Sequence, residues 1–118
     1  MIYTAESRSL ACLENLVHRS GEGNNALYKV MLIEIPDKLA IETLEVASLK
    51  KNWHLIDQYP YCQEIGNAWL HEQRSPILKV PSVVIRKEHN YLINPRHPDF
   101  SAIRLTGNED FDFDQRFS

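Results

Sequence analysis

The stretch IYTAESRSLACLENLVH, residues 2–18, determines how the fold begins. Residues 2–5 combine β-branched and aromatic side chains, a composition that favours a short strand. Ser7 and Ser9 follow directly, and either is a favourable N-cap for a helix that runs to about His18. The chain is therefore predicted to open with a strand followed by a helix.

The helix predicted after this strand has one apolar arc at 100° per residue. That arc is formed by Leu10, Cys12, Leu13, Leu16 and Val17. Glu14 falls at the edge of the arc, so we expect its side chain to be half-buried. Taken alone, this periodicity favours an ordinary solvated glutamate at the rim of the core.

Outward from this opening unit, the hydrophobic pattern divides the chain into short elements. Residues 20–25 predict a turn, and the aliphatic run 26–35 predicts a central strand. Residues 40–44 predict a second strand or a hairpin partner, and residues 61–73 have helical spacing. Further strands are predicted at residues 77–80, 83–85, 91–93 and 102–105, with residues 110–114 as a candidate edge strand.

These elements predict an α+β fold, with a small mixed sheet and helices packed on it. A length of 118 residues fits one domain over residues 1–118. Apolar residues make up 43% of the chain and charged residues 25%, which is typical of a folded globular protein.

Charge and hydropathy exclude several classes of protein. The net charge of -3 argues against a surface for nucleic acid or anionic membrane, because such surfaces need an excess of Lys and Arg. The apolar runs are far shorter than the roughly 20 residues that span a bilayer, and we find no secretory signal pattern. We therefore expect a cytoplasmic protein.

Common catalytic and metal motifs are also missing from the sequence. The lone Gly21-Glu22-Gly23 follows a helix rather than a strand, which argues against a dinucleotide-binding turn. Ser82 follows a proline outside any nucleophile-elbow pattern, and no two histidines are spaced as helical metal ligands. Cys12 and Cys62 lie outside any paired metal-binding or redox spacing, so we expect no metal site.

Four sequence blocks, in this order, resemble the RES-domain toxin family. They are Ile2 to Ser7, Leu10 to Glu14, Val80-Pro81-Ser82, and Asn90 to Phe100, and residues 65–70 also resemble the mid-chain helix of that family. The resemblance covers nearly the whole chain and implies a fold similar to ADP-ribosylating toxins. Within the last block, Asn90, Asn94 and His97 either contact substrate or order the Asn-Pro turns, and we favour the ordering of the turns.

The family resemblance implies an enzyme that destroys NAD or transfers its ADP-ribose, with NAD as substrate and no cofactor. Glu14 takes the place of the catalytic glutamate, while Tyr3 and Ser82 take the places of substrate-binding residues. A carboxylate suits the oxocarbenium-like state formed when the nicotinamide–ribose bond breaks, because it stabilises developing positive charge. The implied partner is an Xre-type helix-turn-helix antitoxin.

One feature of the family has no counterpart in this sequence. The family arginine lies in a glycine-rich stretch before the strand that carries Tyr3, and this chain opens at that strand, so we expect an N-terminally truncated domain. Arg8 and Arg19 come too late to be the same residue, although either could reach a phosphate from another direction. An uncovered sheet edge would also favour a homodimer.

Three functions follow as alternatives from these observations. The first is a toxin that degrades NAD by hydrolysis or phosphorolysis. The second is a protein ADP-ribosyltransferase that uses the same residues. The third is a truncated, inactive domain that only binds its antitoxin.

Overall fold

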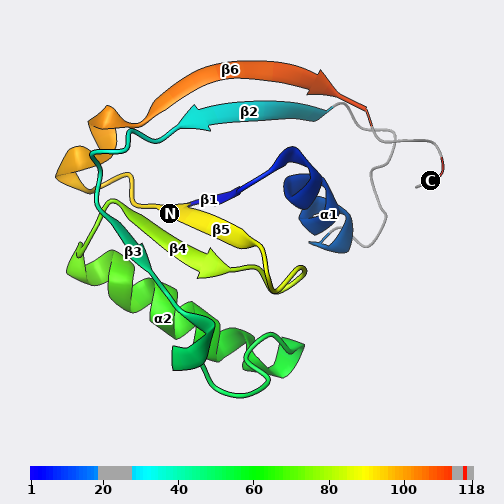
Figure 1. Ribbon diagram of the computed structural model, residues 1–118, viewed down its shortest axis with the longest axis vertical. Helices are drawn as coiled ribbons and strands as arrows, with labels where there is room; N and C mark the ends of the chain where they lie inside the picture. Colours follow the sequence, from blue (N-terminus) through cyan, green and yellow to red (C-terminus); the bar gives the residue numbers. More distant parts are fainter. Residues whose placement is uncertain (19–27, 113–115, 117–118) are drawn as a thin grey trace.

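The fold combines two β-sheets and two α-helices in the computed structural model, which describes residues 1–18, 28–112 and 116 (Figure 1). The α+β class is confirmed. In chain order the helices and strands are β1 (Ile2–Ala5), α1 (Arg8–His18), β2 (Tyr28–Glu34), β3 (Ile41–Thr43), α2 (Tyr59–Glu72), β4 (Ile77–Pro81), β5 (His89–Ile93) and β6 (Arg104–Phe111).

The larger sheet has four strands in the order β1-β5-β4-β3. β5 pairs antiparallel with both β1 and β4, whereas β3 pairs parallel with β4. The sheet is therefore mixed, as predicted. Residues 40–44 do contain a strand, but β3 joins β4 and is not the hairpin partner of β2.

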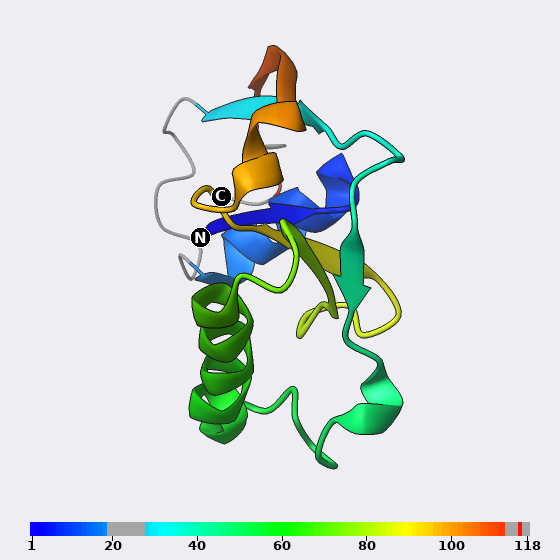
Figure 2. The ribbon, with the colours of Figure 1, turned by 90° about the vertical axis from the view of Figure 1, so that its left-hand side faces the viewer.

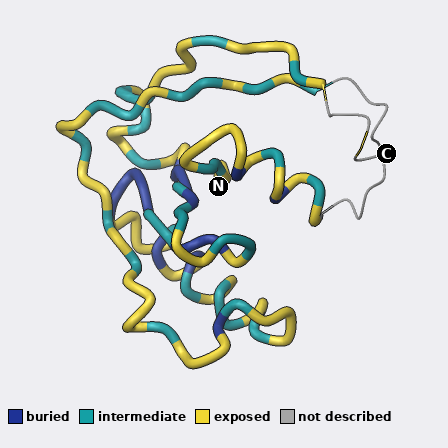
Figure 3. Tube along the Cα trace, turned by 45° about the vertical axis from the view of Figure 1, so that its right-hand side comes forward, coloured by how far each residue is buried: buried dark blue, intermediate teal, exposed yellow. Residues whose placement is uncertain are grey.

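The core lies where α2 packs on this sheet. Trp69 of α2 is fully buried against Leu78 of β4 and Leu92 of β5. The indole Nε1 donates a hydrogen bond to Ser75 Oγ at 2.9 Å, so the polar edge of the ring is satisfied inside the core. Figure 3 shows the buried residues gathered around β4, β5 and α2.

The second sheet is a two-stranded antiparallel ribbon of β2 and β6, which we call the β2–β6 ribbon. It arches away from the four-stranded sheet in two views at right angles (Figures 1 and 2). No residue within these two described strands is buried. The prediction of a central strand at residues 26–35 was thus wrong, because an aliphatic run does not reveal how many neighbours a strand will find.

Two other strand predictions differ from the structure. Residues 83–85 form bends rather than a strand, for a reason that belongs to the site described below. β6 runs from Arg104 to Phe111, so it extends well beyond the predicted 102–105 and takes in the start of the 110–114 segment. Ala102, the first residue of that predicted strand, is instead the last residue of the 3-10 helix η3 (Pro98–Ala102).

The predicted turn at residues 20–25 lies outside the described residues.

None of the helices in the described part of the chain has the length and apolar character needed to cross a bilayer.

Candidate active site

Glu14 reaches the interior from α1, whose start is fixed by a serine cap. Ser7 Oγ accepts a hydrogen bond from the Leu10 amide at 3.1 Å, so of the two predicted caps Ser7 is the one used. Leu10 and Glu14 lie four residues apart, on the same face of the helix, and are 2% and 7% exposed. This stripe faces the rest of the protein.

The expected half-burial of Glu14 was therefore wrong. Leu13 and Val17 of the predicted apolar arc are exposed instead, at 37% and 54%. The helix is turned so that a carboxylate, rather than the widest part of its apolar arc, faces inward. Such an orientation is stable only if the buried carboxylate finds hydrogen-bond donors.

Two donors hold the Glu14 carboxylate, one on each oxygen. Ser82 Oγ donates to Oε2 at 2.8 Å, and Asn90 Nδ2 donates to Oε1 at 2.8 Å. Both donors are fully buried. Together they fix the direction in which the carboxylate points.

Ser82 organises the chain that follows β4. Its Oγ accepts hydrogen bonds from the amides of Val84 at 3.0 Å and Ile85 at 3.1 Å. A serine hydroxyl used in this way folds the next residues into a turn, which explains why residues 83–85 are not a strand. The same oxygen therefore shapes the loop and orients Glu14.

Asn90 connects Glu14 to Tyr3. Its Oδ1 accepts a hydrogen bond from the Tyr3 hydroxyl at 3.0 Å, and its Nδ2 also donates to the Thr4 carbonyl at 3.1 Å. Tyr3 lies opposite Leu92 in the β1–β5 pairing, so its ring reaches Asn90 as a diagonal neighbour on the same face.

The prediction that Asn90 orders a turn was wrong, whereas it holds for Asn94 and His97. Asn94 Oδ1 accepts from the Arg96 amide at 3.0 Å, and His97 Nδ1 accepts from the Asp99 amide at 3.0 Å. Asn90 was identifiable in principle, because strand alternation places this polar residue on the same inward face as Leu92.

Tyr3 keeps its proton over the whole physiological range. Burial of the hydroxyl end and the nearby negative charge of Glu14 raise the pKa of Tyr3 to about 12. The residue as a whole is 56% exposed, because one part of the side chain faces solvent while the hydroxyl reaches buried Asn90. Tyr3 is thus a hydrogen-bond donor with an accessible ring.

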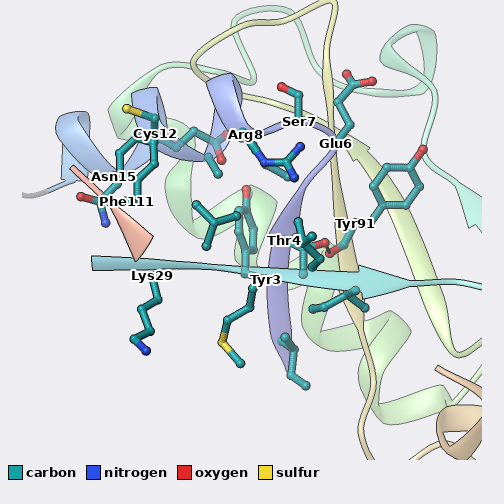
Figure 4. A pocket seen from close by; sticks show the side chains of 18 of the residues that line it. Tyr3, Thr4, Glu6, Ser7, Arg8, Cys12, Asn15, Lys29, Tyr91 and Phe111 are labelled. Carbon is teal, nitrogen blue, oxygen red and sulfur yellow. Dashed lines mark hydrogen bonds between the residues drawn. The ribbon is translucent and has the colours of Figure 1, made fainter. Parts of the chain in front are cut away.

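A cavity of about 700 Å³ opens between β1, the first turns of α1 and the β2–β6 ribbon. Glu14 and Tyr3 both line it, while Ser82 and Asn90 do not. Figure 4 shows the Tyr3 ring inside the space bounded by these elements. The structure thus brings the three predicted site residues together, with Glu14 and Tyr3 at the wall and Ser82 behind Glu14.

Arg8 also lines this cavity, at the start of α1. Its Nη2 and Nε donate to the two carboxylate oxygens of Glu109 in β6, at 2.7 and 3.1 Å. This hydrogen-bonded pairing raises the pKa of Arg8 and lowers the pKa of Glu109. Arg19, the other arginine considered, lies outside the described residues.

The arrangement is suited to stabilising positive charge in a bound molecule. A buried carboxylate at a cavity wall, in a medium less polarisable than water, attracts a developing cation more strongly than a surface carboxylate would. In the described ranges 1–18 and 28–112, no three side chains of the metal-binding types come together.

Comparison with known proteins gives consistent matches over most of the chain. The sequence profile of the RES domain matches residues 1–114. The chain is 37% identical over 107 residues to the Prs ADP-ribosylating toxin of Sphingobium sp. (strain YBL2), which covers 88% of this chain. It is 37% identical over 101 residues to Toxin Res of Yersinia enterocolitica, which covers 86%.

A third relative, Toxin Res of Photorhabdus laumondii, is 33% identical over 116 residues and covers 98% of this chain and 74% of its own length. The chain spans less of the first two relatives, 66% of the length of each.

Proposed function

The chain belongs to the RES domain family, and from this premise we propose that it is a toxin that cleaves NAD between nicotinamide and ribose. One observation carries the proposal. Glu14 is a buried carboxylate at the wall of a cavity, with each oxygen held by a donor from the four-stranded sheet or the loop that follows it. An antitoxin of the Xre type is the protein partner that we propose with it.

In the proposed reaction the bond between the ribose C1′ and the nicotinamide nitrogen breaks. Its electron pair leaves with the nicotinamide ring, and the ribose becomes oxocarbenium-like, with positive charge that Glu14 stabilises. Water then adds to C1′ and releases a proton, giving ADP-ribose. With inorganic phosphate as the acceptor, the product is the corresponding ADP-ribose phosphate ester.

The other residues of the network have distinct roles in this proposal. Tyr3 presents its ring to the cavity, where it can stack on the nicotinamide, and its hydroxyl stays bonded to Asn90. Ser82 was expected to contact substrate, but its burial behind Glu14 favours a role in holding the carboxylate. Asn90 does the same from the opposite oxygen.

Protein ADP-ribosylation is a second candidate, favoured by the likeness to the Prs ADP-ribosylating toxin of Sphingobium. The bond that breaks is the same, and a nucleophilic side chain of a target protein replaces water at C1′. Mass spectrometry of a bacterial lysate treated with the protein and NAD separates the two. Modified peptides would carry the mass of one ADP-ribose, whereas free ADP-ribose indicates hydrolysis.

The direct test is the NAD concentration over time with purified protein, with and without inorganic phosphate. We expect NAD to fall with the unmodified protein and to remain constant with Glu14→Gln, which keeps the shape of the side chain and removes its charge. Glu64→Gln, an exposed glutamate on α2, is the matched control and should retain full activity.

Circular dichroism and thermal unfolding of each variant establish that the fold is retained. Equal NAD loss with Glu14→Gln would exclude the proposed role of Glu14. No NAD loss and no modified peptides with the unmodified protein would instead favour the third alternative, a domain that binds an antitoxin without turnover.

A further inference from the structure

The β2–β6 ribbon is tied to α1 at the cavity by the Arg8–Glu109 ion pair. The two hydrogen bonds run in parallel from one guanidinium edge to one carboxylate. This is the geometry in which arginine binds phosphate groups as well as carboxylates. Glu109 thus presents to Arg8 the same pair of anionic oxygens that a phosphate group would present.

Arg8 and Lys29 are the two basic side chains among the described residues that line this cavity, and only Arg8 is paired toward β6 across it. Glu109 lies opposite Val30 in the ribbon, and Val30 is part of the cavity wall. Lys29 contributes to the cavity wall, but strand alternation directs its ammonium group to the other face of the ribbon, where it lies 3.8 Å from Asp110. Figure 4 shows Lys29 pointing away from Arg8 and Tyr3.

We propose that Arg8 binds the phosphates of the dinucleotide substrate, and that Glu109 occupies this position in the protein without ligand. The inference rests on the proposed function and deepens it. Arg8 and Glu14 lie six positions apart on one helix, or about 9 Å along its axis, so an extended dinucleotide can contact both.

The exposure of the ion pair makes the exchange feasible. The side chains of Arg8 and Glu109 are 56% and 45% exposed, and exposed ion pairs contribute little stability. A pyrophosphate carries more negative charge than one carboxylate, so it can displace Glu109 from the guanidinium. Binding would then release β6 from α1 and loosen one wall of the cavity.

Two substitutions break the same ion pair but should act in opposite directions. Arg8→Gln removes the side chain that would bind the phosphates, and we expect the KM for NAD and the Kd for ADP-ribose to rise about tenfold or more. Glu109→Gln removes the competitor, and we expect both constants to fall about twofold to fivefold. Arg8→Lys keeps the charge without the two-pronged geometry and should lie between Arg8→Gln and the unmodified protein.

Asp110→Asn is the matched control, because it removes the same charge one residue along β6 on the opposite face. It should leave both constants within about twofold, since exposed charges at this distance are screened. Binding of ADP-ribose and of inorganic pyrophosphate is measured by calorimetry, and circular dichroism shows that each variant is folded.

Opposite shifts for Arg8→Gln and Glu109→Gln support the inference. Shifts of KM and Kd in the same direction would show that the Arg8–Glu109 ion pair has a purely structural role, and they would overturn the inference. No shift in either variant would also overturn it. If the unmodified protein cleaves no NAD, the proposed function fails separately. Pyrophosphate binding that Arg8→Gln abolishes and Glu109→Gln strengthens would still support the phosphate site, and its absence would overturn the site as well.

Discussion

Glu14 takes both of its side-chain donors from residues far away in the sequence. Ser82 and Asn90 lie 68 and 76 positions later, yet each approaches one oxygen of the carboxylate at 2.8 Å. A buried carboxylate without such donors would be strongly destabilising. The network therefore holds the fold together around α1 at the same time as it orients the residue that we propose as catalytic.

At this scale, Asn90→Ala should weaken both folding and catalysis. It leaves one oxygen of Glu14 and the Thr4 carbonyl without the Asn90 donor, so the free energy of unfolding should fall by about 1–3 kcal/mol. A carboxylate that is no longer fixed should lower kcat about tenfold to a hundredfold. Denaturant unfolding and NAD turnover measure the two effects.

Asn94→Ala is the matched control for that prediction. Asn94 is buried at the end of the same strand but bonds the Arg96 amide and lies outside the Glu14 network. The Asn94→Ala variant should have a lower free energy of unfolding and an unchanged kcat. An equal loss of kcat in the two variants would show that Asn90 matters through stability alone.

Tyr3→Phe should change how stability depends on alkaline pH. The pKa of Tyr3 is about 12 in the folded protein and 10.0 for an unperturbed tyrosine. Its contribution to stability is therefore complete below pH 10 and is lost between pH 10 and 12. The difference in unfolding free energy between the unmodified protein and Tyr3→Phe should shrink across this window, and a constant difference would contradict the raised pKa.

At the scale of elements, the beginning of α1 depends on one cap. Ser7→Ala removes the acceptor for the Leu10 amide and should lower the unfolding free energy by about 1 kcal/mol. Ser9→Ala, one residue inside the helix, should cost nothing measurable because alanine is a better helix former. Thermal unfolding of the two variants side by side tests this, and an equal loss in both would argue against Ser7 as the cap.

At the scale of the whole molecule, the four-stranded sheet is well packed and the β2–β6 ribbon is lightly packed. β4 and β5 contain buried Leu78, Leu92 and Ile93, whereas the β2–β6 ribbon contains no buried residue along its described strands. Amide hydrogen exchange should therefore be slow in β4 and β5 and faster, by local opening, in β2 and β6.

Within this pattern, Glu109→Gln should accelerate exchange in β2 and β6 only about twofold to fivefold and leave β4 and β5 unchanged, because the exposed ion pair with Arg8 ties the ribbon to α1 but contributes little stability. Uniform protection across both sheets would mean that the ribbon opens only when the whole protein unfolds.

The sequence by itself determined the elements whose signals are local. β1 has its predicted limits, α1 begins after a serine cap, and α2, β4 and β5 lie within a few residues of the predicted positions. Caps, alternation and helical spacing depend on neighbouring residues, so they are visible in a single sequence. The resemblance also named Glu14, Tyr3 and Ser82, which the structure places in one hydrogen-bonded network.

Only the tertiary structure decided how these elements pair and which of their side chains are buried. It placed β2 in a separate ribbon, turned residues 83–85 around the Ser82 hydroxyl, and buried Glu14 where periodicity predicted half-exposure. It also gave Asn90 its central role. Each of these outcomes depends on a partner tens of residues away, and the burial of a polar group is stable only where such a partner supplies its hydrogen bond.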